Sequence, residues 1–331
     1  MAGIGFELKK LFKQQGILKL MRAYGYTGLV TAGPMLLGVC FLMGIGFIGQ
    51  YFGLDAHQRE LLNAMITYAL LGSLVLTGYV SLTLSRYISD MLYTNNERRV
   101  MPSLKGVLAL LLPLGAVLYG TFLCVAGISI GEIILNFLFF MELVVVWTEM
   151  HYMTAIKDYK GILLSYLLAI GLSFLAAAIG CYLFGVQLEV LLLSVILGYG
   201  VMMILNYLLL NAFFPQGSGY YFDFLDWMEQ YRWLSANGFM LNIGLFSHLV
   251  IAWCRPDIGE QIQGLFYGAP QHDVAALYAF MTILVTTINF VASVEVNFYP
   301  KYRAYYDLFN GRGSITEIQL AEQEMMYVME R

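Results

Sequence analysis

The sequence predicts an all-α polytopic membrane protein. Of its 331 residues, 60% are hydrophobic and only 12% are charged, whereas a soluble domain carries about 25% charged residues to cover a surface that faces water. The hydrophobic residues also come in runs of about 20 or more, the length that a helix needs to cross the hydrocarbon core of a bilayer. The runs do not alternate with period two, as the strands of a membrane barrel would. We therefore expect helices with lipid around most of their surface.

Eight apolar runs are long enough to span the membrane. In chain order they cover residues 27–52, 61–89, 104–127, 130–155, 161–184, 187–213, 233–254 and 274–299. The connections between them are short and hold most of the charged residues. This division predicts eight transmembrane helices, since a helix satisfies all of its backbone hydrogen bonds internally.

The positively charged residues give the expected orientation. With the N-terminus in the cytoplasm, 16 of the 18 Lys and Arg residues fall in inner segments, and only Arg59 and Arg255 fall in outer loops. The cytoplasmic loops of membrane proteins are enriched in Lys and Arg. The split therefore predicts a multi-pass protein of the bacterial plasma (inner) membrane with a cytoplasmic N-terminus.

Two segments have the pattern of helices that lie on a membrane surface. Residues 1–26 place apolar side chains on one side and basic ones around the rest, and residues 219–232 mix aromatic with acidic side chains. Six spans separate these two segments, as in transporters built from repeated units. We expect a basic amphipathic interfacial helix at 1–26, an N-terminal lobe with transmembrane helices one to six at 27–214, and the start of a C-terminal lobe at 215–331. That last part would hold helices seven and eight and a cytoplasmic amphipathic segment.

Two of the expected spans carry a stripe of small polar residues. Spacings of three and four keep each stripe on one face of its helix. Such a stripe either holds neighbouring helices together or forms a hydrated wall that meets a polar substrate, and the sequence leaves both interpretations open. The stripes are Ser73, Thr77, Ser81, Ser85 and Ser89 in the second run, and Thr282, Thr286, Asn289, Ser293 and Asn297 in the eighth.

A few further polar residues are expected inside the spans or at their edges. Glu142 lies mid-span, and Glu149 follows seven residues later on the same face. A charge at the membrane centre costs about 2.5–3.5 kcal/mol on insertion scales, so Glu142 is either a proton or substrate site or a protonated carboxyl bonded to a neighbour. For Glu149, and for Arg86 at the inner end of the second run, snorkelling to the boundary is an alternative. Asn237 and His248 are the polar candidates of the seventh run.

The sequence holds no catalytic or metal-binding pattern. Its four cysteines include no CxxC pair, and only four histidines are present, so a structural zinc site is not expected. No GxSxG, HExxH or Walker motif occurs. We expect a protein that is not an enzyme and that has no cofactor and no metal.

Three stretches resemble the PelG family, the membrane subunit of Pel exopolysaccharide export. They are GIGFELKKLF followed by RAYGYTGLVTAGPM near the start, SRYISDMLY at 85–93 and NFYPKYRAYYDLFNGRGSITEIQLAEQEM at 297–325. The span pattern between them agrees, so the resemblance covers the whole chain. PelG is similar to the flippases of the MOP superfamily, whose two six-helix lobes surround a central cavity that spans one, two, seven and eight help to line. The resemblance thus implies a MOP flippase-like fold with one complete six-helix lobe and the first two helices of a second. The chain is expected to be a C-terminally truncated fragment that does not transport by itself.

The function that the resemblance implies is transport of an exopolysaccharide through a polar central cavity, in support of biofilm matrix export. The polymer would be Pel-type and rich in N-acetylhexosamine. The expected cavity residues of the first stripe are Ser73, Thr77, Ser81 and Ser85, and those of the second are Thr282, Thr286, Asn289, Ser293 and Asn297. Arg86, Glu142, Glu149, Asn237 and His248 complete the set. Expected partners are the polysaccharide, a cytoplasmic glycosyltransferase, other membrane subunits of a Pel-type synthase complex and the lipid bilayer, but no nucleic acid. Two alternatives stay open: a flippase for a lipid-linked saccharide, and a non-transporting scaffold subunit of the synthase complex.

Overall fold

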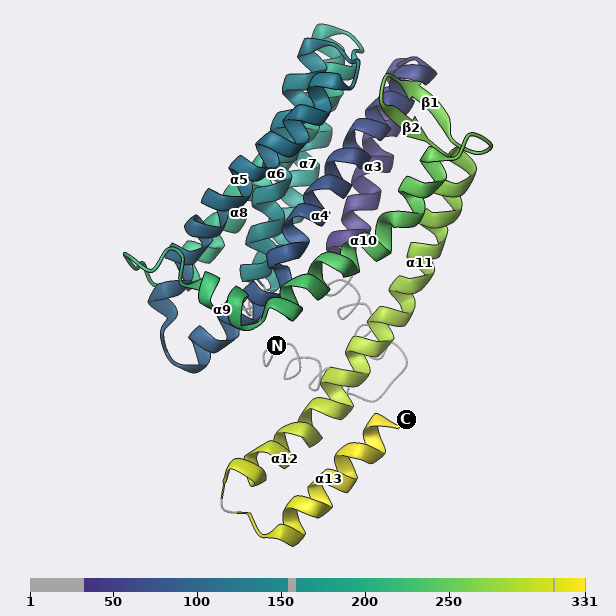
Figure 1. The fold of residues 1–331 in the computed structure, drawn as a ribbon. Helices are drawn as coiled ribbons and strands as arrows, with labels where there is room; N and C mark the ends of the chain where they lie inside the picture. Colours follow the sequence, from purple (N-terminus) through teal and green to yellow (C-terminus); the bar gives the residue numbers. More distant parts are fainter. Residues whose placement is uncertain (1–32, 154–158, 312, 331) are drawn as a thin grey trace. The chain divides into compact units, whose positions relative to one another are not determined.

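The computed structural model describes residues 33–153, 159–311 and 313–330, and the structural statements below concern these residues. They fold almost entirely into helices (Figure 1). Residues 37–276 form one compact unit, and the remaining described residues belong to a second unit. The interfacial helix expected at 1–26 lies outside the described residues.

The larger unit, residues 37–276, is a bundle of long helices joined by short connections, with one small hairpin of strands. Its elements in chain order are α3 (Gly33–Phe52, from Leu37 on), α4 (Ala56–Tyr93), the 3₁₀ turn η1 (Glu97–Arg99), α5 (Val100–Val125), α6 (Ile130–Met153), α7 (Tyr159–Phe184), α8 (Leu188–Phe213), α9 (Phe224–Gln230), α10 (Arg232–Cys254), β1 (Glu260–Gln263), β2 (Phe266–Gly268) and the first residues of α11 (Pro270–Ser293).

Seven helices of the described part of the chain are long and apolar enough to cross a membrane. They are Ala56–Tyr93, Glu97–Val125, Ile130–Met153, Gly161–Phe184, Leu188–Phe213, Arg232–Cys254 and Pro270–Phe290. Each coincides with one of the expected runs from the second to the eighth, which confirms an all-α polytopic membrane protein. Of the first expected run, 27–52, the structure describes the part from Gly33, and this part is helix α3. The arrangement in two lobes stays a prediction.

Helix α4 is longer than the apolar run that predicted it. It begins at Ala56 and ends at Tyr93, a length of 38 residues. The Asp55 carboxylate caps its start by accepting a hydrogen bond from the His57 backbone N–H at 3.1 Å. Its first turns contain Arg59 and Glu60, which suit a helix in water but fall outside any apolar run. The predicted start at residue 61 therefore marked the beginning of the apolar part and not that of the helix.

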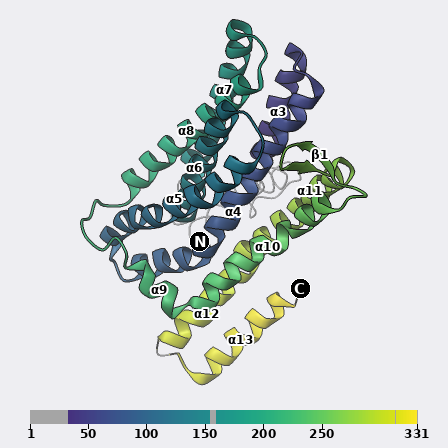
Figure 2. The ribbon, with the colours of Figure 1, turned by 45° about the horizontal axis from the view of Figure 1, so that its top comes forward.

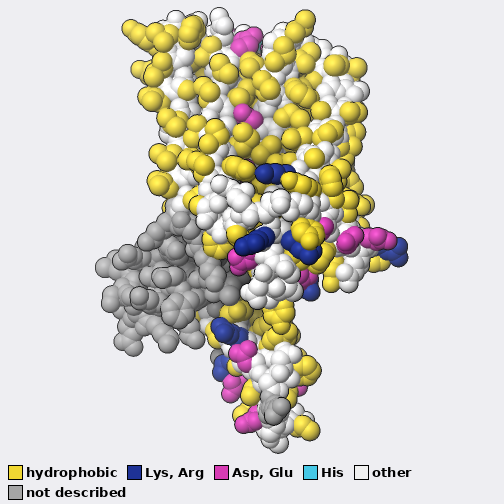
Figure 3. All heavy atoms as spheres, turned by 90° about the vertical axis from the view of Figure 1, so that its left-hand side faces the viewer, with side chains coloured by type: hydrophobic (Ala, Val, Ile, Leu, Met, Phe, Trp, Pro, Cys, Tyr) yellow, Lys and Arg dark blue, Asp and Glu magenta, His cyan; other side chains and the backbone are white. Residues whose placement is uncertain are grey.

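Helix α6 lies at the centre of the larger unit and contacts α4, α5 and α8. Its Phe139, Leu143, Val144 and Val146 are completely buried. Helix α7 packs against α8, and α10 runs along α4, as Figure 2 also shows. On the outside of the bundle, large hydrophobic side chains such as Leu114 are exposed, and hydrophobic side chains cover most of the helical face in Figure 3. Such a surface is stable in lipid and not in water.

The connection between α10 and α11 contains a two-stranded antiparallel hairpin. Strand β1 pairs with β2 so that Glu260 lies opposite Gly268. The turn between the strands packs against the end of α5, where the Leu265 backbone N–H donates to the Ala126 carbonyl at 2.9 Å. Gly264 makes this approach possible, because its φ of +54° favours glycine and a Cβ there would clash with the same carbonyl.

The smaller unit comprises residues 33–36 at the start of α3 and the described residues from Leu277 onward. It contains the rest of α11, a π-helical turn η2 (Val294–Phe298), α12 (Tyr299–Asn310) and α13 (Ile315–Met329). Helix α13 starts with a capping box between Ser314 and Glu317. The hydrogen bond from the Ser314 backbone N–H, with a second one from its hydroxyl, lowers the pKa of Glu317 below its usual value. Lys301 of α12 pairs with Glu324 of α13 at 2.6 Å, so the two helices form a hairpin.

Candidate functional site

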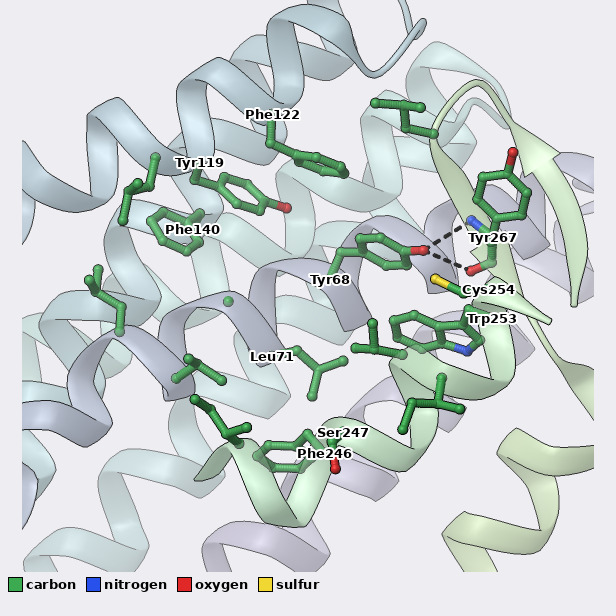
Figure 4. A pocket seen from close by; sticks show the side chains of 18 of the residues that line it. Tyr68, Leu71, Tyr119, Phe122, Phe140, Phe246, Ser247, Trp253, Cys254 and Tyr267 are labelled. Atoms are coloured by element: carbon green, nitrogen blue, oxygen red, sulfur yellow. Dashed lines mark hydrogen bonds between the residues drawn. The ribbon is translucent and has the colours of Figure 1, made fainter. Parts of the chain in front are cut away.

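A pocket of about 1190 Å³ lies in the larger unit between α4, α5, α6, α10 and the β hairpin. Its wall consists mainly of aromatic and aliphatic side chains (Figure 4). Helix α10 contributes Phe239, Phe246 and Trp253, which follow one another at intervals of seven residues and so lie on one face of the helix. Helices α5 and α6 contribute Tyr119 and Phe140, whose stacked rings have centroids 4.1 Å apart.

One end of the pocket is closed by a cluster of rings around Tyr68 of α4. The Tyr68 ring stacks on Trp253 with 4.7 Å between centroids and on Phe122 with 5.8 Å. The edge of Phe266, from strand β2, meets the same ring at 5.0 Å. The Tyr68 hydroxyl accepts from the backbone N–H of Tyr267 and donates to its carbonyl, both at 3.1 Å (Figure 4). One side chain therefore joins α4 to α5, α10 and the hairpin.

Polar groups in the pocket wall are few. The Ser247 hydroxyl donates to the Gly244 carbonyl of its own helix at 3.3 Å. At the rim, the Arg255 guanidinium is bonded to the Asp257 carboxylate at 2.9 Å, so its charge is balanced. A wall of this kind binds apolar groups, and it offers little for the orientation of a ligand rich in hydroxyl groups. The pocket is therefore suited to a hydrocarbon chain more than to a sugar chain.

None of the residues that the sequence analysis proposed for a polar cavity lines this pocket. On α4, the stripe starts among buried side chains. Ser73 and Thr77 are completely buried, and Ser81 is 9% exposed. The three hydroxyls donate to carbonyls three or four residues back in the same helix, at 2.8–2.9 Å, and Ser73 also accepts from Trp147 Nε1 of α6 at 3.0 Å. This part of the stripe serves helix packing, and its place in a cavity stays a prediction.

The lower part of the α4 stripe is more open. Ser85 is half-buried and Ser89 is exposed. Arg86 is exposed, pairs with Asp90 at 3.1 Å, and lies 5.6 Å from the centre of the Tyr231 ring. The stripe thus changes along α4 from a packing surface to an accessible polar surface.

The candidate residues of α10 lie at different depths. Asn237 is exposed, whereas His248 is half-buried, with its ring centre 5.2 Å from that of His272. In the smaller unit the second stripe runs along α11 and into η2, and it is accessible along its whole length. Thr282, Thr286, Asn289 and Ser293 of α11 and Asn297 of η2 are all exposed.

The two glutamates of α6 are enclosed by helices. Glu142 is half-buried and Glu149 is 1% exposed. In each carboxyl group, Oε2 is buried without a hydrogen-bond partner. Among the described residues, no group of three or more His, Cys, Asp and Glu side chains is placed to hold a metal ion.

The sequence analysis missed the aromatic pocket, although one signal pointed to it. Phe239, Phe246 and Trp253 recur every seven residues along α10, which predicts an aromatic face on that helix. Aromatic residues with this spacing occur equally on faces that pack against other helices or against lipid. The pocket also needs Tyr68 and Phe122 from other helices, and their approach depends on the tertiary fold.

Comparison with known proteins identifies the family. The model of the PelG family, described as "Putative exopolysaccharide Exporter (EPS-E)", matches residues 1–331, the whole chain. No curated protein and no solved structure matches. The family match confirms the resemblance carried by the three sequence stretches, and the apolar helices fit a multi-pass membrane protein. The chain belongs to the PelG family of exopolysaccharide exporters.

Proposed function

We propose that the chain takes part in carrying a Pel-type, N-acetylhexosamine-rich polysaccharide across the bacterial plasma membrane along a polar path, for export into a biofilm matrix. Membership of an exporter family supports a transport role. The observation that carries the rest of the proposal is the accessible polar face of α11, made by Thr282, Thr286, Asn289 and Ser293.

The physical argument starts from the cost of polar groups in hydrocarbon. Helix α11 includes a stretch, Pro270–Phe290, that is long and apolar enough to span a membrane. An unpartnered polar group in lipid costs on the order of several kcal/mol. The Thr282 hydroxyl donates to the Ala279 carbonyl of its own helix at 2.7 Å, whereas an amide such as that of Asn289, with two N–H donors and an acceptor, is better satisfied by water, protein or a polar substrate. Hydroxyl and amide groups both donate and accept hydrogen bonds, as the hydroxyls and acetamido groups of such a polymer do. The α11 face is therefore suited to a sugar chain.

Other residues predicted to line the cavity are also candidates for contact with the polymer. Ser85, Arg86 and Asn237 are accessible to some degree and are the polar candidates on α4 and α10 of the larger unit. A cytoplasmic glycosyltransferase would supply the polymer, and other membrane subunits would complete the complex. The N-terminus would lie in the cytoplasm, as the distribution of Lys and Arg favours.

The experiment places bulk on the polar face of α11. Thr286→Trp and Asn289→Trp, introduced separately into the otherwise intact gene, should each lower secreted polymer at least tenfold, because an indole would obstruct the path and remove a hydrogen-bonding group. Ile288→Trp is the matched control, since it lies at the same depth and on the other side of the helix from Thr286. Secreted polymer and membrane protein levels are measured in the same cultures. Wild-type secretion by both stripe variants would overturn the proposal.

The aromatic pocket favours a second candidate, a flippase for a lipid-linked saccharide. A pocket of about 1190 Å³ with an apolar wall has the character that binds a lipid hydrocarbon chain. A flippase and a polymer exporter leave different products behind when they are lost. Cells without the gene should accumulate a lipid-linked saccharide in the first case and a long free polymer in the second, and extraction into organic solvent separates the two.

A further inference from the structure

We infer that helices α6, α7 and α8 enclose a proton-binding site formed by the carboxyl groups of Glu142 and Glu149. The site lies inside the bundle of the larger unit, and neither glutamate lines the aromatic pocket. The claim that proton uptake drives export rests on the proposed function. The claim that the two carboxyl groups bind a proton does not.

Glu149 is the most enclosed member of the site. Its side chain is 1% exposed, and its Oε2 atom is buried without a hydrogen-bond partner. It lies four residues before Met153, the last residue of α6 that the structure describes. A carboxyl group that is covered in this way differs from one that snorkels, because snorkelling brings the charged atoms to water.

Glu142 lies seven residues earlier on the same face of α6, about 10 Å deeper along the axis. Its side chain rests on the backbone of α8. A Cβ added to Gly200 would lie 3.2 Å from Glu142 Oε1, so the glycine leaves room for the carboxyl group. The Oε2 atom of Glu142 is buried and, like that of Glu149, has no partner.

Asn206 adds a third polar side chain at the depth of Glu149. It follows Gly200 by six residues on α8, as Glu149 follows Glu142 by seven on α6. Its Oδ1 accepts from the Ser165 hydroxyl of α7 at 3.0 Å. Its side chain is completely buried, and its Nδ2 has no partner. Unpartnered buried polar atoms are rare in native proteins, and three of them line this part of the bundle.

Among the described residues, no positive charge pairs with either carboxyl group, since none of their ion pairs includes Glu142 or Glu149. Three described tyrosines of neighbouring helices contact α6: Tyr166 of α7 donates to Met150, Tyr199 of α8 meets Phe139, and Tyr119 of α5 stacks on Phe140. Helix α4 contacts α6 through the neutral Ser73, whose hydroxyl accepts a hydrogen bond from Trp147 Nε1.

Two further ionisable residues, His151 and Arg86, are not paired with the two carboxyl groups in any ion pair of the described residues. His151 follows Glu149 by two residues, and side chains at that spacing do not face each other on a helix. Arg86 of α4 is exposed and paired with Asp90.

A proton is the ligand that this arrangement fits. An uncompensated charge inside a membrane protein is costly, and a metal ion would need more oxygen ligands than two separated carboxyl groups provide. A proton needs only one carboxylate oxygen. In the proposed step, a proton from water bonds to a carboxylate oxygen and neutralises it, and the reverse step returns the proton to water. Two carboxyl groups on one face provide positions at two depths.

Infrared spectroscopy of the purified full chain in lipid tests proton binding without reference to export. The wild type should show the carbonyl absorption of a buried protonated carboxyl at neutral pH, shifted in D₂O. Glu142→Gln and Glu149→Gln should each remove part of that band, whereas Glu189→Gln, at an exposed carboxyl at the start of α8, should leave it unchanged. A wild type without the band, or a band that both variants keep, would overturn the site.

Secretion in cells tests whether the site drives export. Collapse of the proton gradient with a protonophore should reduce secretion by the wild type, and Glu142→Gln or Glu149→Gln should reduce it at least tenfold, with Glu149→Asp restoring part of it. Glu189→Gln should secrete as the wild type does. Size-exclusion chromatography of each variant distinguishes lost function from lost folding. Wild-type secretion by both Gln variants would refute coupling, and failure of the intact gene to restore secretion would instead refute the proposed function.

Discussion

At the scale of single residues, Tyr68 illustrates how one side chain organises an end of the bundle. Its ring lies between those of Phe122 and Trp253, and such aromatic pairs contribute about 0.5–1.5 kcal/mol beyond their buried area. Its hydroxyl makes two hydrogen bonds with the backbone of Tyr267, 199 residues away in the sequence. The hairpin is therefore attached to α4 by a group whose importance no local pattern reveals.

Removal of this hydroxyl should loosen the hairpin. Tyr68→Phe keeps the stacked ring but leaves the N–H and C=O of Tyr267 without their partner, which costs about 1–3 kcal/mol. We expect a lower midpoint of thermal unfolding in detergent and faster amide exchange at residues 260–268. Tyr79→Phe, which alters another tyrosine of α4, is the matched control and should change neither. A Tyr68→Phe protein with wild-type unfolding and exchange would contradict this role.

The same scale shows which site residues could be predicted from the sequence. Glu142 and Glu149 stand out because a carboxyl group inside an apolar run is visible without any structure. The contact of Glu142 with Gly200 is not visible in the sequence, since it depends on how α8 packs against α6. The sequence left open whether the hydroxyl residues of α4 pack against other helices or line a cavity. The burial of Ser73 and Thr77 depends on the neighbouring helices, so it could not be predicted from the sequence.

At the scale of elements, the pairing of α4 with α10 is a contact between small residues. Gly78 faces Gly238, where an added Cβ on Gly238 would lie 2.6 Å from the Gly78 carbonyl oxygen. Further along, the hydroxyls of Thr83 and Ser235 are bonded at 2.5 Å. Small residues let helix backbones approach closely in membranes, where lipid competes with larger side chains for the same surface.

A larger side chain in this contact should separate the two helices. Gly238→Leu has no room beside the Gly78 carbonyl, and overpacking of this kind costs about 1–3 kcal/mol. Gly244→Leu is the matched control on the same helix, because a Cβ there meets nothing within 4 Å. Thermal unfolding of both purified variants is measured by size-exclusion chromatography after heating. Equal midpoints for the two variants would show that the contact is not tight.

The membrane-spanning helices could be predicted because exposure to lipid requires long runs of apolar residues, which are visible in the sequence. The runs from the second to the eighth appear as helices because about 20 consecutive apolar residues have one stable arrangement in a bilayer. The hairpin was missed, since strands of four and three residues carry too little periodicity to be recognised. It is held by the Ala126 carbonyl and by Tyr68, which are contacts between distant parts of the chain.

At the scale of the whole molecule, the family match and the span pattern place the chain in a family of exopolysaccharide exporters with several membrane-spanning helices. In the proposed function, three features of the described residues would each have a separate role. The exposed polar face of α11 would meet the polymer, the buried carboxyl pair of α6 would bind the proton, and the aromatic cluster around Tyr68 would hold α4, α5, α10 and the hairpin together. A scaffold subunit would need the third feature but neither of the first two.

The most direct test of the central claim, that the chain moves a polysaccharide, is the amount of polymer outside the cell relative to that retained inside. It is measured in a deletion strain that carries the intact gene or its Asn289→Trp variant, at matched protein levels. The account predicts that the variant still allows synthesis, so that retained polymer rises as secreted polymer falls. A parallel fall of both pools would identify a scaffold that activates synthesis, and a wild-type ratio would show that the α11 face has no part in transport.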